Sequence, residues 1–137
     1  LLATALGTSY INRESRNILL IGDVSFFYDY SSLLLSKNYT LNLSIIIINN
    51  NGGQIFRTLP YNKDPSLKIN SYWTTPVDLS IEKISKLYKT NYYCLNSIGQ
   101  INKQLNSILD TKGINIIELP TDFNQTLEME EKLRENF

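Results

Sequence analysis

The sequence of 137 residues contains no histidine and only one cysteine, Cys94. Without histidine, this chain cannot contain a Ser-His or Cys-His catalytic pair or a histidine-based zinc site. A single cysteine cannot form an internal disulfide, which favours a reducing compartment. Cys94 follows Asn91-Tyr92-Tyr93 in a predicted short strand. We therefore expect it to be a small buried side chain and not a nucleophile.

The chain also lacks a charge excess and a long apolar run. Its 13 basic and 13 acidic residues cancel, and the basic ones are spread along the sequence. A nucleic-acid partner is not expected, because phosphate binding requires a basic face. The apolar run at residues 45–48 is far shorter than the roughly 20 residues that a membrane-spanning helix needs. We expect no membrane span.

Two aliphatic runs, each followed by polar turn residues, are the most informative feature of the sequence. Residues 18–21 precede Gly22-Asp23, and residues 43–48 precede the turn at 49–53, Asn-Asn-Asn-Gly-Gly. Continuous apolar runs of this length are typical of strands buried on both faces of a parallel sheet. The segment between the two runs has the length of one helical crossover, so the strands are expected to be neighbours.

Helical and strand patterns alternate along the rest of the chain. We expect helices over 1–12, 24–36, 78–89, 97–109 and 124–136, and further strands over 91–95 and 114–119. In the second of these helices the residues at buried spacing are Phe26, Phe27, Tyr30, Leu33 and Leu34. The alternation predicts a single α/β domain over 1–137, with a mostly parallel sheet flanked by helices in three layers and right-handed crossovers. The proline-containing segment 59–75 is expected to be a binding or cover loop.

The carboxyl ends of neighbouring parallel strands meet in a crevice where α/β proteins bind ligands. Asp23 offers a carboxylate there, Asn50 a side-chain oxygen and Gly52 a main-chain carbonyl. These hard oxygen ligands suit Mg²⁺, which could hold a diphosphate beside the start of the following helix. Two simpler interpretations stay open: Asp23 or Ser25 as a helix cap, and the asparagine-glycine segment as an ordinary turn.

The pair Gly22-Asp23, followed after about 26 residues by Asn-Asn, resembles the thiamine-diphosphate motif of the decarboxylase and synthase superfamily. Residues 22–35, GDVSFFYDYSSLLL, and 44–60, SIIIINNNGGQIFRTLP, more closely resemble one member. That member is the 2-succinyl-5-enolpyruvyl-6-hydroxy-3-cyclohexene-1-carboxylate synthase (MenD) family. The resemblance implies the thiamine-diphosphate-binding fold. Val24 stands where the wider superfamily has glycine, and MenD enzymes also have an aliphatic residue followed by serine there.

The resemblance also implies roles for individual residues. Mg²⁺ (or Mn²⁺) would be held by Asp23, the side chain of Asn50 and the carbonyl of Gly52. Gly22, Val24, Ser25 and Ile55 would contact thiamine diphosphate, and Ile55 and Phe56 would lie beside the substrate; for these two, ordinary core packing is the alternative. Arg57 is expected to be a surface arginine. No catalytic residue is expected in this chain, because the activating carboxylate of the family comes from another domain of the partner subunit.

The implied activity is that of a transferase (carboligase) in menaquinone or phylloquinone biosynthesis. It decarboxylates 2-oxoglutarate and adds the succinyl-semialdehyde unit to isochorismate. The chain would be the C-terminal domain of a longer protein, truncated on its N-terminal side, and alone would bind cofactor weakly and be inactive. The full-length protein would be a homo-oligomer, a dimer or a tetramer.

Two other kinds of function stay open. One is a different thiamine-diphosphate enzyme, such as an acetohydroxyacid synthase or an oxo-acid decarboxylase. The other is a non-catalytic α/β domain that binds a nucleotide or a protein partner, although no glycine-rich nucleotide-binding loop is present. Abundant Ile, Asn, Lys and Tyr indicate AT-rich coding DNA, from which we expect a plastid stroma, with the bacterial cytoplasm as the alternative.

Overall fold

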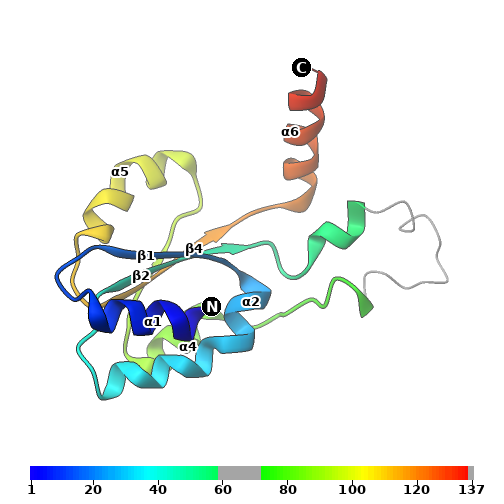
Figure 1. Ribbon diagram of the computed structural model, residues 1–137. Coiled ribbons are helices and arrows are strands. Elements are labelled where there is room, and N and C mark those ends of the chain that lie inside the picture. Colours follow the sequence, from blue (N-terminus) through cyan, green and yellow to red (C-terminus); the bar gives the residue numbers. More distant parts are fainter. Residues whose placement is uncertain (59–71, 136–137) are drawn as a thin grey trace.

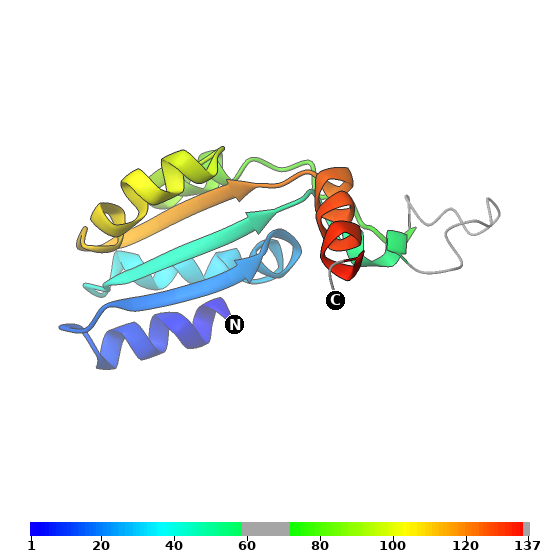
Figure 2. The ribbon, with the colours of Figure 1, turned by 90° about the horizontal axis from the view of Figure 1, so that it is seen from above.

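The computed structural model describes residues 1–58 and 72–135. Their centre is a four-stranded sheet in which every neighbouring pair is parallel and the strand order is β1-β2-β4-β3. Figures 1 and 2 show β1, β2 and β4 side by side with their carboxyl ends at one edge. The strands are β1 (Asn17–Gly22), β2 (Leu43–Asn49), β3 (Asn91–Cys94) and β4 (Ile114–Pro120).

Helices cover both faces of this sheet, so the predicted three-layer α/β fold is confirmed (Figure 1). One face, called here the first face, is covered by α1, α2, the 3₁₀ helix η1 and α4, and the second face by α5. Their bounds are α1 Leu2–Ile11, α2 Asp23–Asp29, η1 Tyr30–Lys37, α4 Ile81–Tyr88 and α5 Ile98–Leu109. The short η2 (Gln54–Thr58) and α6 (Phe123–Glu135) lie beyond the carboxyl edge of the sheet (Figure 1).

The two central strands are buried on both faces, as their apolar runs predict. Side chains alternate between the faces of a strand. On β2, Ile45 and Ile47 are fully buried against the first-face helices, while Ile46 packs against the α5 side. On β4, Ile116 packs against the first-face helices and Ile117 against the α5 side.

The prediction of burial on both faces is wrong for β1. Ile18 and Leu20 remain 50% and 66% exposed, whereas Ile21 on the opposite face is buried. The physical reason is the strand order. β1 is an edge strand, and the apolar side chains of α5 pack on β2, β3 and β4, which leaves this end of the second face uncovered.

The helix predicted over 24–36 is present but changes its geometry halfway. It is α-helical as far as Asp29, whose backbone leaves helical geometry at φ −129°, and then continues as 3₁₀. Because a 3₁₀ helix has about 3.0 residues per turn, the buried spacing of an α-helix is lost. Leu33 is therefore buried, but Leu34 is 61% exposed, contrary to the prediction.

Helices α4 and α5 begin at serine residues that cap them. Ser80 accepts a hydrogen bond from the Lys83 amide at the start of α4, and Ser97 accepts one from the Gln100 amide at the start of α5. These bonds satisfy amides that have no partner within the helix. Each predicted helix is present with its ends within three residues of the predicted range, whereas the short η2 was not predicted.

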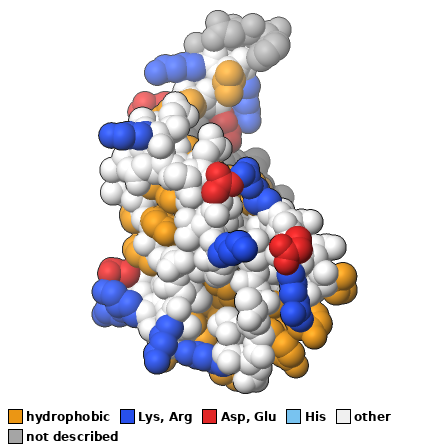
Figure 3. Space-filling model, turned by 90° about the vertical axis from the view of Figure 1, so that its left-hand side faces the viewer, with side chains coloured by type: hydrophobic (Ala, Val, Ile, Leu, Met, Phe, Trp, Pro, Cys, Tyr) orange, Lys and Arg blue, Asp and Glu red, His pale blue; other side chains and the backbone are white. Residues whose placement is uncertain are grey.

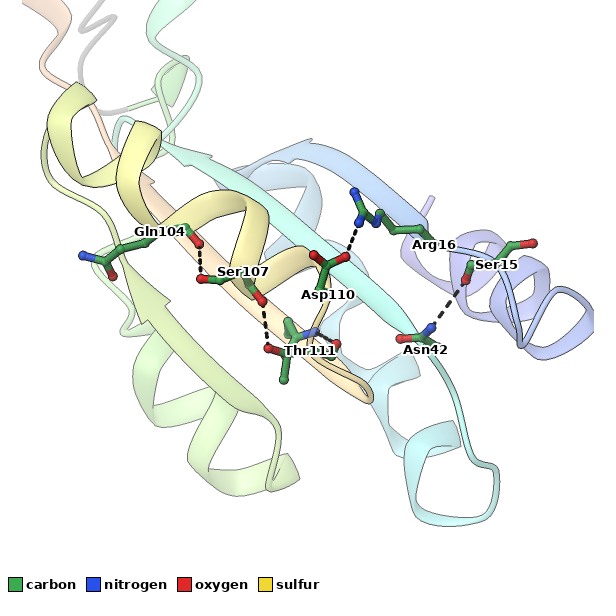
Figure 4. A network of polar contacts seen from close by, with 8 residues as sticks. Ser15, Arg16, Asn42, Gln104, Ser107, Asp110 and Thr111 are labelled. Carbon is green, nitrogen blue, oxygen red and sulfur yellow. Dashed lines mark hydrogen bonds and ion pairs between the residues drawn. The ribbon is translucent and has the colours of Figure 1, made fainter.

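Polar contacts hold the turns at the amino-terminal edge of the sheet, the edge opposite the candidate site (Figure 4). Arg16 forms an ion pair with Asp110, which joins the turn before β1 to the end of α5. The side chain of Asn42 reaches the Ser15 carbonyl, and the Thr111 hydroxyl donates to the Ser107 carbonyl. The same end of the molecule carries Lys and Arg side chains with Asp and Glu among them, and hydrophobic side chains reach the surface between and beside them (Figure 3).

Two further predictions concern Cys94 and the loop over 59–75. Cys94 is exposed, so its predicted burial is wrong; β3 is the other edge strand, and the Cys94 sulfur lies 3.1 Å from Asn96 Oδ1. The loop predicted over 59–75 falls for its greater part, 59–71, outside the described residues. Within the described ranges no helix is long and apolar enough to cross a membrane.

Candidate functional site

The two polar turns singled out from the sequence meet at the carboxyl edge of the sheet. β1 and β2 pair in parallel with Gly22 opposite Ile48, so both turns leave the sheet at the same level. The Gly52 amide donates a 2.7 Å hydrogen bond to Asp23 Oδ2. The expected proximity of the two strand ends is therefore confirmed.

Asp23 is a buried carboxylate, only 2% exposed, at the first position of α2. Its Oδ1 accepts the Val24 amide at 2.8 Å, and its Oδ2 accepts the Gly52 amide. Each carboxylate oxygen can accept two hydrogen bonds or ligands, so one acceptor position per oxygen remains. Gly22 occupies the N-cap and no side chain caps the helix, so the capping interpretation of Asp23 and Ser25 is wrong.

The buried charge of Asp23 has no basic side chain as its partner within the described ranges. A buried carboxylate normally needs a cation or several hydrogen-bond donors. Two backbone amides supply part of this need. A divalent cation with oxygen ligands fits the remaining acceptor positions.

The three consecutive asparagines have different environments. Asn49 donates to Glu118 Oε1 at 2.6 Å and accepts the Asn51 amide, while Asn51 donates to Asp78 Oδ1 and accepts two amides of the 77–78 segment. In contrast, the half-buried Asn50 side chain has no hydrogen bond to any described residue, and only its main-chain carbonyl is engaged, by Gln54. Of the three side-chain amides, only that of Asn50 forms no hydrogen bond within residues 1–58 and 72–135, which is compatible with a role as a ligand.

Glycine is required at position 52 by the backbone. Gly52 has φ +118°, and a Cβ there would lie 2.3 Å from the Thr74 carbonyl oxygen. The Gly53 amide donates to this same carbonyl at 2.6 Å, which holds the turn against the 72–75 segment. Gly22 differs, because a Cβ there would meet nothing within 4 Å. The space beside Gly22 is open to a ligand that approaches the strand end closely.

The residues predicted beside the cofactor and substrate lie around this edge. Val24 lines a recess of about 180 Å³ together with Phe27, Tyr28 and the 75–77 segment, and its amide is engaged by Asp23. Ile55 is 72% exposed, which excludes core packing for this side chain. Phe56 packs edge-to-face against Trp73, with 5.7 Å between the ring centroids.

Arg57 is more engaged than a surface arginine. Its Nη1 donates to Gln54 Oε1 at 3.2 Å, and its guanidinium lies 4.3 Å from the ring centroid of Phe123 on α6. The side chain is half-buried, so Arg57 is a partly exposed arginine that these two contacts hold in place. The contact with Phe123 joins η2 to α6.

Sequence reasoning missed Glu118, which lies at the same edge on β4. Glu118 accepts Asn49 Nδ2 at Oε1 and the Tyr92 hydroxyl at Oε2, at 2.6 and 2.5 Å. A signal was present in the sequence, since an acidic residue within the largely apolar run 114–119 needs hydrogen-bonding partners. Among the residues described there is no cluster of three or more acidic, cysteine or histidine side chains. The candidate metal ligands are instead one carboxylate, one amide and one carbonyl.

This combination of fold and strand-end geometry has a counterpart among known protein families. Residues 1–119 match the family described as thiamine pyrophosphate enzyme, C-terminal TPP binding domain. The chain belongs to this family of cofactor-binding domains.

Among curated proteins, the chain is similar to 2-succinyl-5-enolpyruvyl-6-hydroxy-3-cyclohexene-1-carboxylate synthases, as the resemblance to the MenD family predicts. It is 38% identical to the synthase of Oceanobacillus iheyensis over 93% of the chain, and 39% identical to that of Leuconostoc mesenteroides over 88%. Identity to the Enterococcus faecalis synthase is 30% over 97% of the chain. The chain spans 22% of the length of the first two relatives and 23% of the third.

A solved structure shares the fold. The thiamine diphosphate-dependent 4-hydroxybenzoylformate decarboxylase of Rhodococcus jostii superposes with a TM-score of 0.72 and 22% sequence identity. The superposition covers 87% of this chain and 22% of the decarboxylase chain. The relatives named above are all bacterial and give no support to the expected plastid setting.

Proposed function

We propose that this chain is the diphosphate- and Mg²⁺-binding domain of a thiamine-diphosphate-dependent synthase of the MenD type. The observation that carries the proposal is the buried Asp23 carboxylate, bonded to the Gly52 amide in the turn that also contains Asn50. The wider protein would decarboxylate 2-oxoglutarate and add the succinyl-semialdehyde unit to isochorismate. The names of the similar synthases support this reaction, which gives menaquinone or phylloquinone precursors.

The residues of this chain would bind and orient the cofactor. Asp23, the Asn50 side-chain oxygen and the Gly52 carbonyl would hold Mg²⁺ (or Mn²⁺), while Gly22, Val24 and Ser25 would lie against the diphosphate. When bound, thiamine diphosphate supplies the carbanion-stabilising chemistry, and the protein supplies position and electrostatics. Ile55, exposed beside this edge, would contact cofactor and substrate, with Phe56 next to it.

Binding should depend on the metal for an electrostatic reason. A diphosphate and the Asp23 carboxylate are both anionic, and at short distance in a buried site they repel each other strongly. A divalent cation between them converts this repulsion into two attractions. The described residues contain no basic side chain paired with Asp23 that could replace the metal.

The test is cofactor binding by the full-length protein, measured by thermal stabilisation. Thiamine diphosphate with Mg²⁺ at a hundredfold excess over its dissociation constant should stabilise the protein by about 2.7 kcal/mol. Removal of Mg²⁺ with EDTA should abolish this gain, and neither ATP nor NAD should produce it. Asp23→Ala should lose the gain. Asp110→Ala, which removes an exposed carboxylate at the opposite edge, should keep it.

Equal stabilisation of the Asp23→Ala variant and the parent would refute the assignment. The substrate assignment has a separate test, which is product analysis with 2-oxoglutarate and isochorismate. Formation of an acetohydroxyacid from pyruvate, without turnover of 2-oxoglutarate, would favour the acetohydroxyacid synthase alternative.

We further propose that the full-length protein is a homo-oligomer and that it acts in the cytoplasm of a bacterium. Light scattering tests the oligomeric state, and the genomic context of the gene tests the bacterial origin.

A further inference from the structure

A chain of hydrogen bonds crosses the carboxyl edge of the sheet from β3 to the proposed metal-binding turn. The Tyr92 hydroxyl on β3 donates to Glu118 Oε2, and Asn49 at the end of β2 donates to Glu118 Oε1. Asn49 in turn accepts the Asn51 amide at 3.1 Å. Glu118 is thus linked through Asn49 to the turn that contains Asn50 and Gly52.

The strand register explains why these three side chains meet. Glu118 lies opposite Ile47 of β2 and opposite Cys94 of β3. Because alternate residues share a face, Glu118 projects on the same side as Ile116, and Asn49 on the same side as Ile47. Ile116 and Ile47 belong to the first-face core, against which Tyr92 also packs. The three polar side chains therefore form the end of that core.

Asn49 acts as the connection between sheet and turn. Its main-chain carbonyl accepts the Thr121 amide at 2.8 Å, which extends the pairing of β2 with β4 beyond the strand. Its side-chain oxygen accepts the Asn51 amide, and Asn51 has a left-handed φ of +60°. Such a conformation persists in a non-glycine residue only when its surroundings hold it. The orientation of the Asn49 amide therefore fixes the start of the turn.

Glu118 determines the orientation of that amide. The bond from Asn49 Nδ2 leaves the Asn49 side-chain oxygen directed at the Asn51 amide, and a reversed amide would place oxygen against the Glu118 carboxylate. No ion pair of Glu118 with a basic side chain is found within the described ranges, so its hydrogen bonds come from these neutral donors. Burial, followed by the hydrogen bond to Glu118, raises the pKa of Tyr92 above its ordinary value and keeps its hydroxyl a donor.

We propose that Glu118 is a positioning residue for the metal site, acting through Asn49 on the turn that presents Asn50 and Gly52. This inference rests on the proposed function. Residues that orient metal ligands without touching the metal typically contribute about 10- to 100-fold to metal affinity. Glu118→Gln keeps the size of the side chain but leaves one oxygen to serve two donors. It should raise the Mg²⁺ concentration required for half-maximal thiamine diphosphate binding by about 10-fold or more.

The experiment titrates Mg²⁺ against thiamine diphosphate binding in the full-length protein, by calorimetry and without turnover. Asn91→Ala is the matched control. Asn91 donates to Asn115 at 2.9 Å and so joins the same two strands, β3 and β4, at their other end. It should leave the Mg²⁺ requirement unchanged, even if it lowers the melting temperature as much as Glu118→Gln does.

Exchanging the hydrogen-bond donor and acceptor between positions 49 and 118 distinguishes a positioning role from a general loss of structure. In the double variant Glu118→Gln, Asn49→Asp, the new amide at 118 can donate to the new carboxylate at 49. The Tyr92 hydroxyl and the Asn51 amide then keep their acceptors. The double variant should recover to within about threefold of the parent, whereas each single variant should remain impaired, because it lacks one of these matched donor and acceptor pairs.

These measurements test the role of Glu118 separately from the proposed function. An unchanged Mg²⁺ requirement in Glu118→Gln, an equal loss in Asn91→Ala, or no recovery in the double variant would overturn the role of Glu118. Should Glu118→Gln fail to fold, Tyr92→Phe decides instead. It removes only one bond to Glu118 and should raise the requirement about threefold; no change would overturn the role. If Asp23→Ala retains Mg²⁺-dependent binding, the proposed function itself fails.

Discussion

At the scale of single residues, the turn after β2 depends on a glycine that no other residue can replace without strain. Gly52 combines a left-handed φ of +118° with a Thr74 carbonyl oxygen 2.3 Å from its would-be Cβ. Gly113 has a similar φ, +99°, but no atom within 4 Å of that position. A comparison of alanine variants at these two glycines therefore distinguishes the cost of a left-handed backbone from the added cost of a clash with Thr74.

Gly52→Ala should lower the free energy of unfolding by about 3 kcal/mol or more, because strain and collision add. Gly113→Ala should lower it by only about 1 kcal/mol, the cost of the left-handed conformation alone. Urea denaturation of the two variants measures the difference. Equal losses would show that the contact with Thr74 relaxes at no cost.

At the scale of elements, the Asp29 carboxylate at the end of α2 holds the start of α1. Asp29 Oδ2 accepts the Ala3 amide at 3.0 Å, which satisfies one of the unpaired amides in the first turn of α1. This hydrogen bond is the main cause that lowers the pKa of Asp29 below its ordinary value of 3.8. The charged form of Asp29 is thus favoured in the folded state.

A lowered pKa fixes the sign of the pH dependence. The stabilisation by Asp29 is fully present above 3.8 and is lost as the pH falls from there through the lower folded value. The protection of the α1 amides against hydrogen exchange, expressed relative to the intrinsic exchange rate at each pH, should therefore fall below that pH in the parent protein. The Asp29→Asn variant has no titrating group at this position, so it should show lower protection at neutral pH and a smaller further fall on acidification. A parallel pH response of the two proteins would contradict the assignment.

At the scale of the whole molecule, the two faces of the sheet differ in how much they are covered. Ile45 on β2 is fully buried, while Leu20 on β1 is 66% exposed at the uncovered end of the second face. Ile45→Ala should lower the free energy of unfolding by about 2 to 5 kcal/mol, because it leaves a cavity. Leu20→Ser should change it by no more than about 0.5 kcal/mol. A large loss from Leu20→Ser in denaturation would show that this face is covered.

Local elements could be predicted from the sequence, whereas features that depend on the arrangement of the strands could not. Helix and strand positions follow from local apolar periodicity, so 43–48, 97–109 and 114–119 were predictable within a few residues. The exposure of Ile18 and Leu20 depends on strand order, which local patterns do not contain. The same holds for Glu118, because β4 is inserted between β2 and β3 and so meets Asn49 across 69 positions of sequence.

Within the candidate site, residue types and spacing predicted that Asp23 and the 49–53 turn would be close, which the bond from Gly52 confirms. The sequence alone could not distinguish the environments of Asn49, Asn50 and Asn51. That difference arises from partners far along the chain, Glu118 and Asp78. The half-buried position of Arg57 likewise depends on Phe123, a residue of the distant α6.

The central claim is that one divalent cation is held between the two strand-end turns. The most direct measurement is a crystal structure of the full-length protein with thiamine diphosphate and Mn²⁺, in which anomalous scattering locates the metal. We predict one metal peak about 2.1 Å from an Asp23 carboxylate oxygen, the Asn50 side-chain oxygen and the Gly52 carbonyl. A cofactor bound with its metal away from Asp23 would contradict the account.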